Sequence, residues 1–205
     1  APGKTLVFID EVQEAPDIMT MAKFLVEDGR CRWAFSGSML GTQFKGVRSY
    51  PVGYVHELRM FPLDFEEFCW AIGVSEGARQ TIRDACISER PIPDYIHDAM
   101  MANFRTYTVV GGMPEVVQRF LDTRGGLASV RQLQSELNEQ YRRDISKYAS
   151  GRVLQVQSIY DQLPIMLEGE NKRFVLNSID PKAHYEKYQR DFVWLVDAGV
   201  ALKAD

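Results

Sequence analysis

The hydrophobic positions near the start of the chain form one unbroken run, Leu6–Ile9, and two acidic residues follow it directly. An apolar run without alternation, rich in β-branched and aromatic residues, predicts a strand that is buried on both faces. Asp10 and Glu11 then stand where that strand ends. Ligands of open α/β sheets bind outside the carboxyl ends of the strands. The pair is therefore a candidate site, with a solvated turn after a core strand as an equal alternative.

The pattern downstream predicts a βαβ arrangement with a parallel sheet. Apolar residues at helical spacing indicate a helix over Ile18–Glu27 that ends at Gly29. Further strands are predicted over Arg32–Phe35, which leads into Ser36-Gly37-Ser38, and over Val55–Phe61, with a flexible loop from Gly41 to Pro51 between them.

Helices dominate the rest of the pattern. Pro62-Leu63-Asp64 opens a helix in which Asp64 and Glu67 have the spacing of a capping box. Four more helices, separated by proline and glycine clusters, are predicted over Ser75–Glu89, Asp94–Val109, Glu115–Leu121 and Leu127–Ala149. The last region is predicted to hold a helix over Val153–Leu167, a strand over Arg173–Leu176, a helix over Ala183–Asp197 and the start of a strand over Val200–Lys203.

Composition is that of an ordinary soluble globular protein. The chain has 205 residues, of which 45% are hydrophobic and 25% charged, and its formal net charge is −4. This charge gives no general case for a polyanionic partner. The three cysteines are widely spaced, which argues against a disulfide framework or a zinc site and favours a cytoplasmic location. No apolar run reaches the roughly 20 residues of a membrane helix, so we expect no membrane contact.

Asp10 and Glu11 have the arrangement of a Walker B motif. In such a motif the aspartate holds Mg²⁺, and the glutamate polarises the water that attacks the γ-phosphate of ATP. Ser36 ends the next strand, so its hydroxyl is predicted to lie beside the two carboxylates and to help position that water. A turn of small residues is the alternative interpretation of Ser36.

Four stretches carry a wider resemblance, and they occur in order along most of the chain: Leu6–Pro16, Ala34–Ser38, His56–Phe68 and Gly111–Val117. Together they resemble the AAA-type ATPases of bacteria and archaea, in the poorly characterised group that carries a C-terminal domain of unknown function. The resemblance implies an α/β fold with a partial P-loop NTPase parallel sheet. The sheet would lie in residues 1–62, a helical lid region in residues 63–150 and a winged-helix-like module in residues 151–205.

The resemblance also implies roles for individual residues. Asp10 would be the metal residue, Glu11 the catalytic base and Ser36 the sensor position. The turn made by Gly111, Gly112 and Pro114 resembles a lid motif that packs near the nucleotide base. The implied cofactor of the intact protein is Mg-ATP.

Two features depart from the family pattern. Residues 1–205 contain no Gly-x-x-x-x-Gly-Lys-[Ser/Thr] phosphate loop, and Gly3-Lys4-Thr5 leads into a strand where a phosphate loop would open a helix. We therefore expect a fragment of a longer protein, with the phosphate loop upstream and no nucleotide bound to the fragment itself. Val52-Gly53-Tyr54 stands where many relatives carry a Gly-Arg pair, which leaves Arg48 and Arg59 as weak candidates for an arginine finger.

The C-terminal region resembles a winged-helix unit at Tyr160–Pro164, Asn171–Phe174 and Trp194–Val200. Its core would include Tyr188, Phe192 and Leu195, and its outer face Lys182, Lys187 and Arg190. Five basic residues against two acidic ones between Asn171 and Arg190 make a small positive excess. Winged helices bind DNA or proteins, so both kinds of partner stay open.

Three functions follow as alternatives: an ATPase fragment, a DNA-binding regulator switched by nucleotide, and a protein-interaction scaffold without turnover. The resemblance places the phosphate-loop strand between the Trp33 strand and the Val55 strand. Without it, those strands must either close up or leave unpaired edges. We therefore expect a rearranged sheet or a homo-oligomer.

Overall fold

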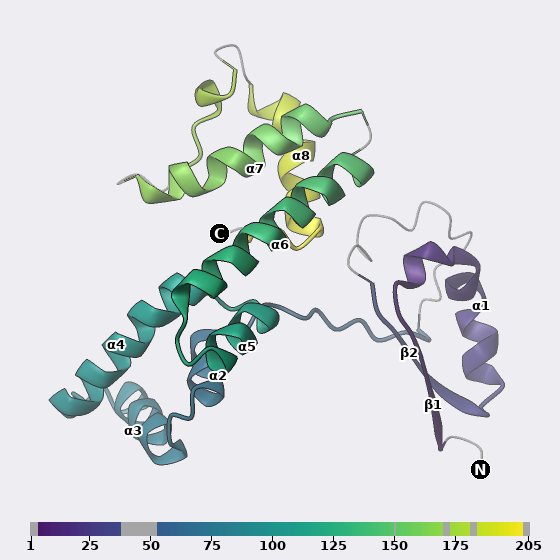
Figure 1. Ribbon diagram of the computed structural model, residues 1–205. Coiled ribbons are helices and arrows are strands. Elements are labelled where there is room, and N and C mark those ends of the chain that lie inside the picture. Colours follow the sequence, from purple (N-terminus) through teal and green to yellow (C-terminus); the bar gives the residue numbers. More distant parts are fainter. Residues whose placement is uncertain (1–3, 38–52, 150, 170–172, 181–183, 203–205) are drawn as a thin grey trace. The chain divides into compact units, whose positions relative to one another are not determined.

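The computed structural model describes residues 4–37, 53–149, 151–169, 173–180 and 184–202. The chain divides into two compact units, which Figure 1 shows as ribbons. Unit 1 comprises Ala1–Leu58 and Tyr141–Asp205, and unit 2 comprises Arg59–Gln140. Some predictions fall outside the described residues, namely those that concern Gly3, Ser38, Arg48, Val52, Lys182, Lys203, the loop from Gly41 to Pro51 and residues 171–172.

A two-stranded parallel sheet with a connecting helix begins unit 1. The elements are β1 (Thr5–Ile9), α1 (Pro16–Glu27) and β2 (Cys31–Phe35). The register pairs Thr5 with Cys31 and Ile9 with Phe35. The predicted βαβ order of these three elements is confirmed. The Trp33 indole N–H donates to the Leu25 carbonyl oxygen at 3.1 Å and so fastens α1 to the sheet.

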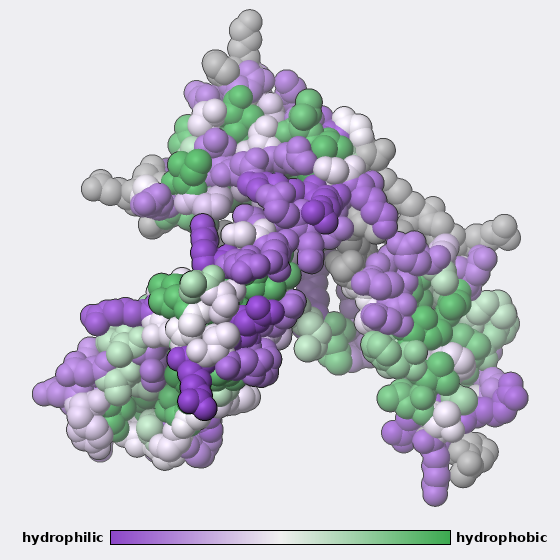
Figure 2. Space-filling model, viewed as in Figure 1, coloured by the Kyte–Doolittle hydropathy of each residue, from purple (hydrophilic) through white to green (hydrophobic). Residues whose placement is uncertain are grey.

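One face of this sheet is uncovered, contrary to the prediction of a strand buried on both faces. Leu6 and Phe8 are 63% and 61% exposed, whereas Val7 and Ile9 on the opposite face are half-buried. Figure 2 shows hydrophobic side chains on the visible surface of the part formed by β1, β2 and α1. Apolar side chains favour burial of a strand, but a face is buried only where another element packs against it. Here α1 packs against the face that carries Trp33.

The prediction of a third strand over Val55–Phe61 is wrong, because this segment is irregular. Residues 54–58 border a hollow of about 330 Å³, and Trp33, Ala34 and Phe35 of β2 also line it. A strand needs a neighbour within about 4.8 Å to complete its ladder of hydrogen bonds. Residues 55–61 have the composition of a strand, but no described strand pairs with them. Arg59, one of the two weak candidates for an arginine finger, is exposed in the same segment.

Unit 2 is built from helices around one apolar core. Its elements are α2 (Phe65–Ala71), α3 (Glu76–Ile87), α4 (Asp94–Val110), α5 (Pro114–Asp122) and the first part of α6 (Leu127–Tyr148). All of these helices were predicted and are confirmed. The buried core residues are Phe68, Val110, Val116, Val117, Val130 and Leu133. None of the helices in the described part of the chain is both long and apolar enough to cross a membrane.

Local sequence signals explain where α2, α3 and α5 begin. The predicted capping box is present, since the Glu67 N–H donates to Asp64 Oδ1 at 2.8 Å and the Asp64 N–H donates to Glu67 Oε2 at 2.9 Å. This box satisfies two of the backbone donors that a helix start leaves unpaired. Ser75 caps α3 in a similar way, and Pro114 stands in the first turn of α5.

The C-terminal region of the chain is helical in its described part. It holds α7 (Val153–Glu168), the short η3 (Leu176–Ser178) and α8 (Tyr185–Asp197). The predicted helices are confirmed, and Tyr188 and Leu195 are buried in the expected core. The strand predicted over Arg173–Leu176 is wrong, and residues 200–202 of the other predicted strand are irregular. Because a wing consists of strands, the winged-helix prediction gains no support from these residues.

A buried ion pair joins the start of α7 to α8. Asp191 is 2% exposed and is the buried charged residue among the described side chains. Arg152 donates from Nε to Asp191 Oδ1 and from Nη2 to Oδ2, each at 2.5 Å, and Nη2 also reaches the Lys187 carbonyl oxygen at 2.8 Å. The hydrogen bonds that Arg152 donates to Asp191 raise the pKa of the Arg152 guanidinium, which therefore stays charged.

We expect Asp191→Ala to lower the free energy of unfolding of the C-terminal helices by about 2 kcal/mol. The substitution leaves the Arg152 guanidinium without its carboxylate, but this side chain is 35% exposed and water replaces part of the loss. The matched control is Asp161→Ala, which removes the more exposed pair with Arg142 and should cost less than about 1 kcal/mol. Hydrogen exchange of the α7 and α8 amides measures both. Equal losses in the two variants would contradict a special role for the buried pair.

Candidate functional site

The carboxyl ends of β1 and β2 bring Asp10 and Ser36 together. Ser36 extends the parallel ladder, since its N–H donates to the Ile9 carbonyl oxygen at 3.0 Å. The Ser36 hydroxyl donates to Asp10 Oδ1, which also accepts the backbone N–H of Glu11 at 3.1 Å. The predicted proximity of Ser36 to the acidic pair is therefore confirmed. Both hydrogen bonds use Oδ1, so with respect to the described residues Oδ2 of Asp10 stays available to a further partner.

A tight turn holds Glu11 next to Asp10. Glu11 has φ 50° and ψ 48°, in the left-handed region that is uncommon for residues other than glycine. The chain continues as the 3-10 helix η1 (Val12–Glu14), in which the Glu14 N–H donates to the Glu11 carbonyl oxygen at 2.9 Å. Val12 anchors the turn, because its side chain is fully buried and its N–H donates to the Ser36 carbonyl oxygen at 2.9 Å. Tertiary packing thus maintains a backbone conformation that Glu11 would rarely adopt alone.

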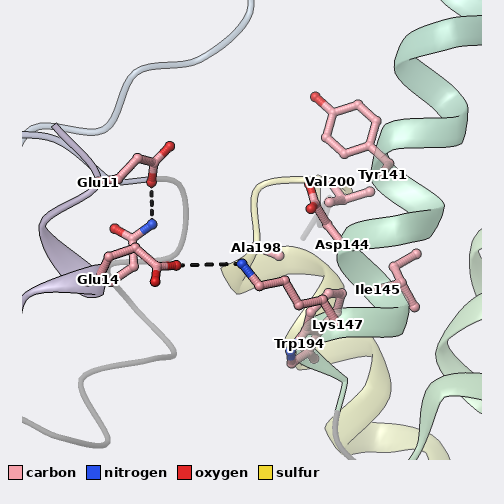
Figure 3. Close-up of a pocket in the computed structure, with 10 residues that line it drawn as sticks. Glu11, Glu14, Tyr141, Asp144, Ile145, Lys147, Trp194, Ala198 and Val200 are labelled. Carbon is pink, nitrogen blue, oxygen red and sulfur yellow. Dashed lines mark hydrogen bonds and ion pairs between the residues drawn. The ribbon is translucent and has the colours of Figure 1, made fainter.

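Gln13 is the site residue that the sequence analysis missed. Its amide Nε2 donates to Glu11 Oε2, the hydrogen bond that is drawn at Glu11 in Figure 3. Both side chains line a solvent-open hollow of about 310 Å³ within unit 1. The only sequence signal for this contact is an amide two residues after the acidic pair, and no periodicity marks it. The turn geometry of η1 was needed to bring the two side chains together.

The oxygen donors at this strand end suit a hard cation. Asp10 and Glu11 supply carboxylates and Ser36 a hydroxyl, and Mg²⁺ prefers oxygen ligands. Proteins commonly hold Mg²⁺ through one or two carboxylates together with phosphate oxygens and waters. The residues present therefore fit a magnesium ion that is shared with a phosphate ligand. In the described ranges, no group of three or more His, Cys, Asp or Glu side chains could hold a metal ion.

The remaining predicted site residues lie in unit 2, whereas Asp10, Glu11 and Ser36 lie in unit 1. Gly111 follows α4 with φ 78°, and Pro114 opens α5. Gly112 lies against the backbone of Leu63, whose N–H donates to the Gly112 carbonyl oxygen at 2.7 Å. The turn at Gly111–Pro114 therefore connects the segment before α2 to α4 and α5. Its contact with a nucleotide base stays a prediction.

A family match supports an AAA-like domain in the N-terminal part of the chain. Residues 1–69 match the family described as AAA domain. Residues 101–205 match the family described as Domain of unknown function (DUF8612), and this match spans just over half of the chain. The chain therefore belongs to the DUF8612 family and combines its domain with an AAA-like N-terminal part. No curated protein and no solved structure matches the chain significantly.

Proposed function

We propose that this chain carries the Walker B half of an AAA-type ATPase that binds and hydrolyses Mg-ATP when complete. One observation carries the proposal: an acidic pair ends a parallel strand, and the serine that ends the neighbouring strand bonds to its aspartate. Ligands of α/β sheets bind at this edge. The AAA domain match over residues 1–69 supports the same class.

Each residue of the site has a separate proposed task. Asp10 would hold Mg²⁺ through Oδ2, directly or through water, while the Ser36 hydroxyl fixes its orientation through Oδ1. Glu11 would accept a proton from the attacking water as a general base. When bound, the metal ion supplies stabilisation of the charge that develops on the phosphate oxygens. Ser36 lies close enough to orient a water between the two strand ends.

A phosphate loop would have to come from outside residues 1–205, because these residues contain no such motif. The resemblance places the phosphate-loop strand between β2 and residues 55–61, and these residues are irregular in the structure. Self-association of the uncovered sheet and DNA binding by the C-terminal region stay predictions.

The complete protein is expected to hydrolyse Mg-ATP, whereas residues 1–205 alone should bind it no more tightly than the millimolar range, roughly −4 kcal/mol. The reason is that backbone N–H groups of a phosphate loop supply most contacts to the phosphates. Thr5 begins a strand here, so Lys4 and Thr5 do not open a helix. Calorimetry with Mg-ATP measures both proteins. Micromolar binding to residues 1–205 that is lost in Lys4→Ala would contradict this interpretation.

A further inference from the structure

The side chains of Gln13 and Glu11, two positions apart in the turn that follows β1, form a hydrogen bond. Gln13 is the middle residue of η1, and its Nε2 donates to Glu11 Oε2. An ionised carboxylate only accepts hydrogen bonds, so the nitrogen end of the amide has to face it. The pair therefore has a defined polarity, with Gln13 as donor and Glu11 as acceptor.

The other end of the same amide lacks a partner. Gln13 Oε1 is buried and has no hydrogen-bond partner among the described residues. Folded proteins leave few buried polar atoms unsatisfied, and water or a catalytic role explains many of the exceptions. Gln13 and Glu11 line the same hollow. Because Gln13 Oε1 is closed to solvent, only the N–H end of the amide serves Glu11.

From this geometry we infer that Gln13 is a positioning residue for Glu11, an inference that rests on the proposed function. The amide N–H holds Glu11 Oε2, which leaves Glu11 Oε1 to face the attacking water. Glu11 Oε1 takes one hydrogen of that water as a proton, and the other hydrogen stays on the attacking oxygen. The water oxygen forms its bond to the γ-phosphorus, and the bond to the β,γ-bridging oxygen breaks. The bridging oxygen leaves with the electron pair on ADP.

Kinetics of the complete protein test this role. Gln13→Leu removes both hydrogen-bonding groups, and Gln13→Glu keeps the size but replaces the donor with an acceptor. Both are expected to lower kcat about tenfold or more, with KM for Mg-ATP changed less than about twofold. The matched control is Gln132→Leu, which removes an exposed glutamine–glutamate pair of the same chemistry, Gln132 Nε2 to Glu136 Oε1 at 2.9 Å. It should leave both constants unchanged.

A double-mutant cycle separates positioning from a merely structural effect. If Gln13 acts through the Glu11 carboxylate, Gln13→Leu should have little further effect on single-turnover hydrolysis in a Glu11→Gln background. A structural role would lower the rate by the same factor in both backgrounds. Additive effects would therefore overturn the inference, even if both single variants were slow.

A measurement without nucleotide tests the contact itself. In the 205-residue chain, the side-chain amide NMR signals of Gln13, assigned by their loss in Gln13→Leu, should move in Glu11→Ala. They should not move in Glu14→Ala, because the Glu14 carboxylate pairs with Lys147 at 3.6 Å, whereas Gln13 Nε2 donates to Glu11. Unmoved signals in Glu11→Ala, or a normal kcat in both Gln13 variants while Glu11→Gln is inactive, would overturn the inference alone. An active Glu11→Gln would overturn the proposed function with it.

Discussion

Replacing Glu11 with glutamine in the complete protein is expected to slow ATP hydrolysis about 10²- to 10⁴-fold, while Mg-ATP affinity stays nearly unchanged. The amide keeps the size of the side chain and an oxygen that can accept from Gln13, so the turn should survive. It cannot accept a proton from water, so the general-base contribution is lost. Phosphate release measures the rate, and calorimetry measures the affinity.

Asp10 should respond differently, since its proposed task is to hold the metal ion. Asp10→Ala is expected to weaken Mg-ATP binding and hydrolysis together. The substitution removes the carboxylate that would hold the metal ion, and with it the acceptor of the hydrogen bond from Ser36. Glu14→Gln is the matched control, in the same turn but outside the strand end, and should hydrolyse ATP at the normal rate. Equal hydrolysis by the wild type and Glu11→Gln would remove the assignment of Glu11 as the base.

Replacing Gly112 with alanine is expected to lower the free energy of unfolding of unit 2 by about 3 kcal/mol. A Cβ atom at Gly112 would lie 2.1 Å from the Leu63 carbonyl oxygen, a backbone atom that cannot rotate away. The Leu63 segment would have to move and would weaken two hydrogen bonds, Leu63 N–H to Gly112 O at 2.7 Å and Tyr107 Oη–H to Leu63 O at 2.8 Å. Burial raises the pKa of the Tyr107 hydroxyl, which therefore stays a donor at neutral pH.

Gly77→Ala is the matched control for this prediction. Gly77 lies in α3, and a Cβ atom there would meet no atom within 4 Å. Alanine is the better helix former, so stability should stay equal or rise by up to about 1 kcal/mol. Hydrogen exchange of the α2, α4 and α5 amides reports on unit 2 in the intact chain. A Gly112→Ala protein as stable as Gly77→Ala would contradict the close approach of Gly112 to Leu63.

Much of the secondary structure could be predicted because its signals are local. The Asp64–Glu67 capping box, Pro114 in the first turn of α5 and Gly29 after α1 each mark a helix end through contacts within a few residues. The strand–helix–strand order of β1, α1 and β2 was predictable for the same reason. Part of the candidate site was also predictable from the sequence. The carboxyl ends of adjacent parallel strands lie at one edge of a sheet, and this places Ser36 beside Asp10.

The predictions that were wrong concern strands, whose formation and burial depend on residues far away in the sequence. Residues 55–61 have the composition of a strand, yet a strand exists only when another strand accepts and donates its hydrogen bonds. The same reasoning applies to residues 173–176. The apolar run of β1 could not reveal that Leu6 and Phe8 stay uncovered, because burial depends on which elements pack against a face.

The sequence by itself therefore determined the helices, the two strands and the position of the acidic pair at the end of β1, since hydrophobic periodicity and capping are properties of neighbouring residues. Only the tertiary structure decided the left-handed turn at Glu11, its hydrogen bond from Gln13 and the contact of Gly112 with Leu63. Packing imposes each of these. The buried Val12 maintains the turn at Glu11, and the helical core of unit 2 brings Leu63 to the turn after α4.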